Sequence, residues 1–258
     1  MAGKLSISAF ITALLVCACG TSPVTDLQRY QLKGDVLCEE VHLDGGSSYT
    51  AWFGRNGMLD SLIQVNPRET LSNVYSYDRR GRLKEHSIYR TDRHYEGYYL
   101  YNYKGNVLES YTLFGWDLQA IFDWKYDIED GRQVRCRYYN EGALVSTTEY
   151  VYGKRSKMES VFDAEGAPCG EITYTYLDSY RLESTRSEDV DIRISYGEGL
   201  LPERSYGGLV EPDGEIAAMS GAHIEYEYEK DAHGNWISRT ETISGAEGRT
   251  ISRTITYR

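Results

Sequence analysis

The sequence predicts an all-β protein built as an antiparallel meander of hairpins. Two aromatic residues stand two positions apart, a polar turn, a glycine and an aliphatic residue follow, and this unit recurs about every 24 residues. Aromatic and β-branched residues at alternate positions, broken by Asp, Asn and Gly, are typical of strands and tight turns. No stretch after the N-terminal segment carries the apolar spacing of an amphipathic helix. A fixed period of this length indicates a repeat architecture.

The repeat can be followed along most of the chain. Its clearest copies are residues 75–83 and 99–107. In the same register, copies begin at residues 51, 75, 99, 124, 150, 174, 194 and 226, and Ile255-Thr256-Tyr257 ends the chain. The spacing becomes irregular toward the C-terminus, where we expect bulges or loop insertions.

The turn that follows Tyr77 predicts how its two strands pair. A three-residue loop with Gly81 in the left-handed conformation pairs Asp78 with Arg82 and places Tyr77 opposite Leu83. A two-residue loop would put Leu83 on the opposite face from the tyrosine, so the three-residue loop is the better interpretation because it gathers the apolar groups.

The same register places Tyr75 opposite Glu85. Each unit has a second aliphatic segment after its turn, so we expect two strands per unit and roughly sixteen strands from about eight units. Short connections favour antiparallel neighbours. The expected form is one long sheet, twisted or curled rather than flat, spanning residues 31–258 as one domain. The repeat does not specify whether this sheet closes on itself.

The first eighteen residues are expected to be an export signal. Lys4 precedes an apolar run from Leu5 to Val16, which is too short for a comfortable bilayer span. An ordinary secreted signal or a membrane anchor are the alternatives to a lipoprotein signal.

Ala18-Cys19-Gly20 is similar to a lipoprotein signal-peptidase site, in which a small residue precedes the cysteine that is acylated. Cys17 fits less well because bulky Val16 precedes it. We therefore expect a lipid on Cys19 and a short tether at residues 19–30. No acidic residue follows Cys19, so we expect anchoring in the outer membrane, with the domain facing either the periplasm or the cell surface.

The remaining residue types exclude several functions. A net charge of −11 repels polyanions, so we expect no nucleic-acid partner. The five histidines lack the spacing of metal ligands, and no phosphate loop or nucleophile elbow occurs, so we expect no metal, cofactor or catalytic residue. Glu39-Glu40 and Glu129-Asp130 are interpreted as solvated edges or turns rather than a glycosidase pair.

Three cysteines follow the signal, namely Cys38, Cys136 and Cys169. Since three is odd, at most one disulfide can form between them, and the sequence does not specify which.

The segment 75–83, Tyr-Ser-Tyr-Asp-Arg-Arg-Gly-Arg-Leu, resembles the tyrosine-aspartate repeats of RHS proteins. The opening Leu32-Lys33-Gly34-Asp35-Val36 and the closing residues 226–258 are similar to those of small RHS-repeat-like lipoproteins of Gram-negative bacteria. The resemblance covers residues 31–258 and implies a β-repeat fold without a defined activity. Large RHS proteins form a β-shell around a toxic C-terminal domain released by self-cleavage. No such domain or motif is found here, so we expect no toxin function.

We therefore expect a lipid-anchored, non-enzymatic protein of the cell envelope with a binding or structural role. One alternative is a glycan or cell-wall polymer module that stacks sugar rings on tyrosines. Its candidate residues are Tyr75, Tyr77, Tyr99, Tyr101, Tyr150, Tyr152, Tyr174 and Tyr176. The other is a protein–protein module that adds a strand to an exposed sheet edge. A purely structural role for these tyrosines is favoured, since their rings pack on a sheet while their hydroxyls remain hydrated or bonded.

Overall fold

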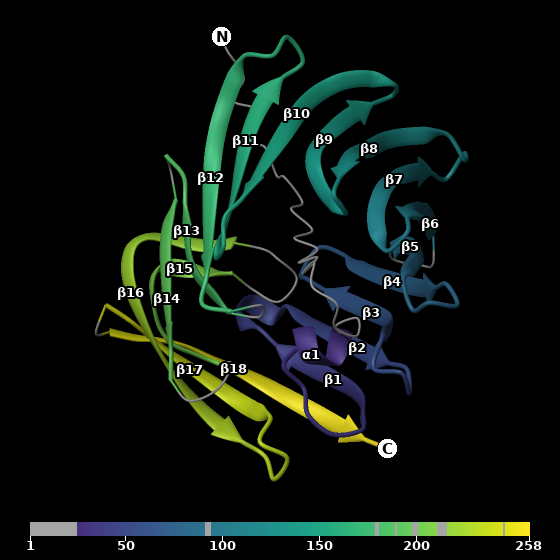
Figure 1. Ribbon diagram of the computed structural model, residues 1–258. Coiled ribbons are helices and arrows are strands. Elements are labelled where there is room, and N and C mark those ends of the chain that lie inside the picture. The colour runs from purple at the N-terminus through teal and green to yellow at the C-terminus, as the bar shows by residue number, and fades with distance from the viewer. Residues whose placement is uncertain are drawn as a thin grey trace.

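The computed structural model describes residues 25–90, 94–178, 181–188, 190–197, 201–210, 216–244 and 246–258. Within them, two short helices, α1 (Asp26–Arg29) and the 3₁₀ helix η1 (Asp44–Gly46), accompany eighteen strands (Figure 1). The strands are β1 (Val36–His42), β2 (Ser48–Phe53), β3 (Leu59–Val65), β4 (Thr70–Tyr77), β5 (Leu83–Arg90), β6 (His94–Lys104), β7 (Val107–Gly115), β8 (Ala120–Glu129), β9 (Arg132–Asn140), β10 (Ala143–Tyr152), β11 (Ser156–Asp163), β12 (Pro168–Tyr176), β13 (Leu182–Arg186), β14 (Asp191–Tyr196), β15 (Pro202–Val210), β16 (Ile216–Lys230), β17 (Trp236–Ile243) and β18 (Ala246–Tyr257).

The strands form one closed antiparallel barrel. Each strand pairs with the strands before and after it in the sequence, and β1 pairs with both β2 and β18. The all-β class and the meander order are confirmed, but the expected open sheet, twisted or curled, is wrong. The closing contact between β1 and β18 brings together residues such as Glu39 and Arg253, 214 positions apart, which no local repeat pattern encodes.

The eight repeat units map onto the strands without exception. Their aromatic pairs begin in β2, β4, β6, β8, β10, β12, β14 and β16, so each unit is one even-numbered strand and the strand after it. Because consecutive strands are antiparallel, the loops after even-numbered strands gather at one end of the barrel and the loops after odd-numbered strands at the other. We call these the even end and the odd end.

The turn between β4 and β5 has the predicted form. Tyr77 lies opposite Leu83, and the backbone N–H of Asp78 donates to the carbonyl of Arg82 at 2.8 Å. Gly81 has a φ of 74°, the left-handed conformation that a side chain resists.

The prediction was wrong one step further along the strand. Tyr75 lies opposite His86 rather than Glu85, because a β-bulge falls between Ser76 and Tyr77. The extra residue that a bulge inserts shifts every later pair by one position.

A ninth repeat unit, split between the two ends of the chain, closes the barrel. Tyr257 of β18 lies opposite Val36 of β1, and the backbone N–H of Arg258 donates to the carbonyl of Asp35 at 2.9 Å. Gly34 has a φ of 89° and takes the place that glycine holds in the other turns. The C-terminus therefore supplies the first half of this unit and the N-terminal part of the domain supplies the second.

Asn235 ties this split turn to its neighbour. Its side-chain oxygen accepts from the N–H of Lys33 at 2.7 Å, and its amide nitrogen donates to the carbonyl of Lys33 at 2.9 Å and to the hydroxyl of Tyr257 at 2.7 Å. The residue is 1% exposed, so its amide is fully used within the protein.

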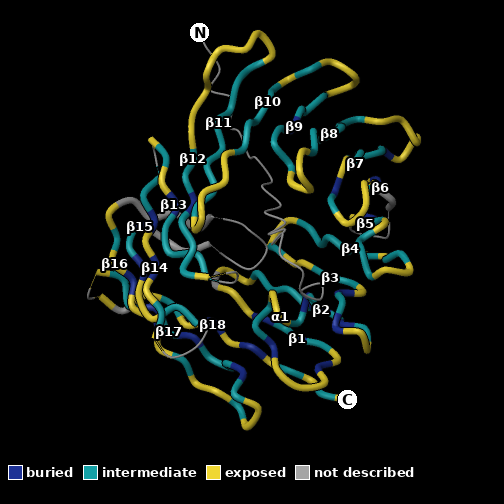
Figure 2. Tube along the Cα trace, in the orientation of Figure 1, coloured by how far each residue is buried: buried dark blue, intermediate teal, exposed yellow. Residues whose placement is uncertain are grey.

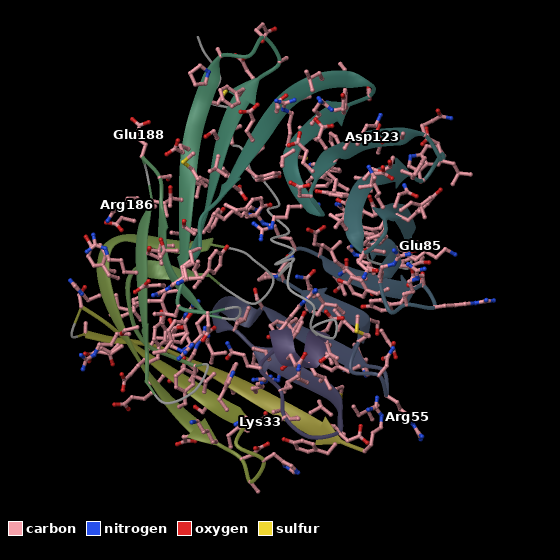
Figure 3. All side chains as sticks on the ribbon, viewed as in Figure 1. Lys33, Arg55, Glu85, Asp123, Arg186 and Glu188 are labelled. Atoms are coloured by element: carbon pink, nitrogen blue, oxygen red, sulfur yellow. The ribbon has the colours of Figure 1, made fainter. Side chains whose placement is uncertain are left out.

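Buried positions alternate with more exposed ones along several strands, as in β14 (Figure 2), so the two faces of the sheet differ in burial. The face that carries the aromatic pairs also holds the fully buried side chains, including those of Phe53, Ile192 and Ile251. In a single closed sheet only the enclosed face can exclude water so completely, so this is the inner face. The outer face carries charged side chains, and those of Glu85 and Arg186 point away from the barrel in Figure 3.

Helix α1 packs on the inner face at the even end. It begins with a capping box, in which Thr25 and Gln28 exchange hydrogen bonds between side chain and backbone. One carboxylate oxygen of Asp26 accepts from the N–H of Leu59 at 2.8 Å and lies 3.0 Å from the hydroxyl of Tyr77. These residues fall at the end of the expected tether. Residues 1–18 and Cys19 lie outside the described part of the chain.

A buried ion pair lies at the seam between β1 and β18. The Nε of Arg253 donates to a carboxylate oxygen of Glu39 at 2.6 Å, and the two side chains are 1% and 0% exposed. The same guanidinium donates to the carbonyl of Tyr30 and lies 4.5 Å from the centre of the Trp236 ring. Burial raises the pKa of Glu39 to about 7, against the opposing attraction of Arg253.

We expect this raised pKa to make stability depend on pH. The folded protein holds the Glu39 proton more tightly than the unfolded chain, so the resulting stability is present below about pH 4.5 and is lost as pH rises through about 7. The difference in unfolding free energy between the natural protein and Glu39→Gln should therefore fall by up to about 3 kcal/mol over this range. Urea denaturation at several pH values measures it, and a pH-independent difference would contradict the assignment.

Candidate functional site

The predicted tyrosines all lie on the inner face, where three tyrosines next to even-end turns act as structural latches. Each latch donates its hydroxyl to the backbone carbonyl of the first residue after the preceding even-end turn, at 2.9 Å, and only Tyr77 among them was a predicted stacking residue. The pairs are Tyr77 with Leu59, Tyr103 with Leu83, and Tyr196 with Leu182. This bond joins each hairpin to the one before it and accounts for a tyrosine, rather than a phenylalanine, at this position.

Basic residues at the end of these turns cover the tyrosine rings of the next unit. The guanidinium carbons lie 4.5 to 5.8 Å from the ring centres in the pairs Arg82–Tyr103, Arg132–Tyr152 and Arg181–Tyr196. In two of the turns an aspartate holds the arginine in place, at 2.7 Å between Asp78 and Arg82 and between Asp178 and Arg181. The turn aspartate and arginine of the repeat thus have a structural role.

A second group of aromatic side chains forms a continuous stack across β4 to β9 on the inner face. We call it the aromatic belt, and its members are Tyr75, His86, Tyr99, Tyr101, Tyr111, Phe122, Trp124, Tyr126 and Tyr138. The ring of Trp124 lies at its centre, with ring centroids 4.4 Å from Tyr111 and 5.0 Å from Tyr138. Offset stacking of this kind stabilises the rings in one orientation.

His86 is part of this stack as a neutral ring. It lies between Tyr75 and Tyr99, with centroid distances of 4.6 and 5.4 Å, and its Nε2 is 2.8 Å from the side-chain oxygen of Asn73. Burial lowers the pKa of His86 to about 4, so the ring carries no charge at neutral pH.

All nine members of the aromatic belt are only half-buried. The described contacts of α1 and its flanking residues reach β2, β3, β4 and β18, where Tyr30 packs edge-on against Phe53 and the carbonyl of Tyr30 accepts from Arg253. None of these contacts extends over β6 to β9. The belt is therefore an aromatic surface inside the barrel that the described residues leave partly open.

Beyond the aromatic belt, the inner face of β9 to β12 becomes more polar. Burial raises the pKa of the Cys136 thiol to about 11, so it stays protonated and unreactive. The ammonium of Lys157 lies 4.5 Å from the ring centre of Tyr150 and 2.6 Å from a carboxylate oxygen of Glu159. Tyr174 is buried, and burial raises its pKa well above the usual value.

A shallow hollow of about 530 Å³ lies on the outer face beside β9, β10 and the loop after β11. Arg135, Arg137, Glu149 and Phe162 line it. Both arginines are already paired, at 2.8 Å between Arg135 and Glu149 and 2.6 Å between Arg137 and Asp127. With its cations neutralised, this hollow offers a ligand no free charge of its own.

The carboxylate pairs considered from the sequence do not form a reaction centre at β1. Glu39 points inward to Arg253, whereas Glu40, on the opposite face, is 3.2 Å from His42. Of the cysteines, Cys38 is half-buried, Cys136 buried and Cys169 exposed, and all three are free thiols. Among the described residues, no three His, Cys, Asp or Glu side chains are grouped as metal ligands, and no helix is long and apolar enough to cross a bilayer.

Of the eight predicted stacking residues, the structure places Tyr75, Tyr99 and Tyr101 in the aromatic belt. Tyr77 is a latch, and Tyr150, Tyr152, Tyr174 and Tyr176 lie further around the inner face on β10 and β12. The prediction missed His86, Tyr111, Phe122, Trp124, Tyr126 and Tyr138. Each of these residues faces a belt residue on a neighbouring strand or lies two positions from one along its own strand, so the alternation of inward-facing residues could have identified them. Applying this alternation requires the register of every strand pair.

No protein-family model matches the chain, and no curated protein matches it. Among solved structures, it is similar to a porin-like protein from Bacteroides uniformis ATCC 8492, with 12% identity and a TM-score of 0.42 over 87% of this chain and 98% of that one. It is also similar to TcdB2–TccC3 without its hypervariable C-terminal region, with 11% identity and a TM-score of 0.29 over 76% of this chain and 13% of that one. At these values the likenesses support no argument about function.

The latch hydrogen bonds can be tested by removing one hydroxyl. Tyr103→Phe keeps the ring under Arg82 but loses the bond to the Leu83 carbonyl, so we expect it to lower the unfolding free energy by about 1 kcal/mol. Tyr139→Phe is the matched control, because its hydroxyl on the outer face has no hydrogen-bond partner among the described residues. We expect a change within about 0.5 kcal/mol for the control. Equal effects in urea denaturation would refute the latch.

Proposed function

We propose that this chain is a lipid-anchored, non-enzymatic protein of the cell envelope whose aromatic belt binds an envelope glycan inside the barrel. The observation that carries the proposal is the stack of nine half-buried aromatic rings on the inner face of β4 to β9. Such a surface matches the C–H faces of sugar rings, and tyrosine hydroxyls beside it match their hydroxyl groups. Ligand sites generally combine an aromatic lining with a few polar groups in this way.

The charged outer face favours a barrel that is surrounded by water rather than by lipid. In this proposal the lipid on Cys19 is its attachment to the membrane. Ion pairs lie on the outward side of several strands, at 2.6 Å for Arg137–Asp127, 2.7 Å for Arg193–Asp191 and 3.2 Å for Arg204–Glu225. A barrel that spans a membrane presents an apolar band there, and charged residues in that band are costly. We propose attachment to the outer membrane through the lipid alone.

A structural spacer is the second candidate, favoured by the latches, which show that much of the repeat chemistry serves the fold. The closed barrel argues against the alternative in which a partner protein adds a strand to an exposed sheet edge. Every strand has a neighbour on each side, so only short overhangs remain, such as Pro168–Ile172 of β12 on the side of β13. Loss of glycan binding on disruption of the aromatic belt would distinguish the binding role from the spacer.

We expect Trp124→Ala to weaken glycan binding at least about tenfold, since it removes the central ring of the aromatic belt. The chain from residue 20 onward is screened on a glycan array, and its best ligand is then titrated by calorimetry. Trp116→Ala is the matched control, because this tryptophan is 76% exposed in the loop after β7. Trp124→Phe, which keeps a stacking ring, should retain most of the affinity. Absence of any ligand at millimolar concentration, or equal affinity of Trp124→Ala, would reject the proposal.

Lipidation is tested separately. Cells that express the full chain are labelled with an alkyne fatty acid, and we expect Cys19→Ala to abolish the label on the protein. Cys17→Ala is the matched control and should keep the label, because Cys17 fits the acylation site less well. Retention of the label in Cys19→Ala would refute anchoring at this residue.

A further inference from the structure

Free basic side chains gather at the even end of the barrel. At the turns after β2, β4, β6 and β10, five of them are exposed and have no ion pair or side-chain hydrogen bond with the described residues: Arg55, Arg79, Arg80, Lys104 and Lys154. Some other basic residues of this end are held within the protein, as Arg82 is by Asp78 and Arg181 by Asp178. The five free cations have no visible structural role.

The odd end has the opposite charge. Its described loop residues include exposed Asp117, Glu141, Glu165 and Glu188, against one free cation among them, Arg68. Figure 3 shows the two ends apart, with Lys33 and Arg55 at the lower side of the view and Glu188 at the upper side. The even end also carries exposed Glu129 and Asp130 at the turn after β8, so its basic surface is centred on the turns after β2, β4 and β6.

Most of these cations lie side by side on the rim. Arg55, Arg79 with Arg80, and Lys104 belong to the turns after β2, β4 and β6, which follow one another around the barrel. Neighbouring strands are about 4.8 Å apart, so successive turns at one end are roughly 10 Å apart and these cations span an arc of roughly 20 Å. That arc is wide enough to contact several lipid headgroups at once.

The described chain also begins at this rim. Leu27 donates its backbone N–H to the carbonyl of Gly57 at 3.0 Å, and a Cβ at Gly57 would lie 3.2 Å from the Cβ of Thr25. Gly57 belongs to the same turn as Arg55. Five residues lie between Cys19 and Thr25, and the six steps from one to the other reach at most about 20 Å. A lipid on Cys19 therefore keeps the even end close to the bilayer.

We propose that the even end is a docking surface for the phosphate headgroups of an anionic phospholipid bilayer. It orients the barrel with its acidic odd end away from the membrane. The orientation rests on the proposed lipid at Cys19, whereas the affinity for anionic headgroups rests on the free cations alone. Each basic side chain near an anionic surface adds a modest attraction, and several acting together give measurable binding that salt weakens.

The test uses the chain from residue 20, which carries no lipid and retains every described element of the barrel. It is sedimented with phosphatidylcholine vesicles that contain either no phosphatidylglycerol or about 40% phosphatidylglycerol, which makes the vesicle surface strongly anionic. We expect binding to the anionic vesicles only, and a steep loss of binding as salt rises.

Two charge-matched variants locate the surface. Arg79→Gln/Arg80→Gln removes two free cations at the even end, and we expect it to weaken vesicle binding on the order of tenfold. Arg68→Gln/Arg186→Gln removes the same charge near the odd end and should change binding less than about twofold. Equal losses in the two variants, or equal binding to neutral vesicles, would overturn the proposal. Since no lipid on Cys19 takes part, this result is independent of the labelling experiment and of glycan binding.

Discussion

The backbone hydrogen bonds of β1 to both β2 and β18 are the constraint on which the rest of the structure depends. They turn a meander with two exposed edges into a barrel, and so create an enclosed face. Glu39 and Arg253 are buried only because these strands meet, and the aromatic belt faces an interior only because the sheet is closed. The split ninth unit makes this closure specific, since Tyr257 and Arg258 find the missing half of their own repeat in Asp35 and Val36.

Local geometry was predictable from the sequence, and closure was not. The turn after Tyr77 specifies its own register because glycine in the left-handed conformation admits only a few loop types. That register holds only up to the first bulge, and nothing in the sequence around Ser76 marks a bulge, so Tyr75 was paired wrongly. The motif at 32–36 can be recognised in the sequence only as an isolated opening segment. Its partner is at the other end of the chain, and a pattern confined to neighbouring residues contains no information about that pairing.

The candidate site divides in the same way. The tyrosine repeat indicates the inner face, but it does not distinguish the latches, which stabilise the fold, from the rings of the belt. The belt takes Tyr99 and Trp124 from the aromatic pairs of the repeat, and Tyr138 from a second strand. A residue type that recurs for structural reasons therefore indicates the face on which a site lies rather than the site. The register of the strand pairs, which shows which rings stack across neighbouring strands, is needed to identify the site itself.

The same reasoning separates the basic residues of the even end. Within the turn 78–82, Arg82 is needed by the fold, because Asp78 holds it over Tyr103. Arg79 and Arg80, at the tip, are exposed and form no ion pair or side-chain hydrogen bond with the described residues, and the same holds for Arg55 and Lys104 at the adjoining turns. Like charges on neighbouring turns repel one another and so lower the stability of the folded state. This repulsion occurs at the even end, from which the chain continues toward Cys19. An anionic membrane surface facing the even end would offset it.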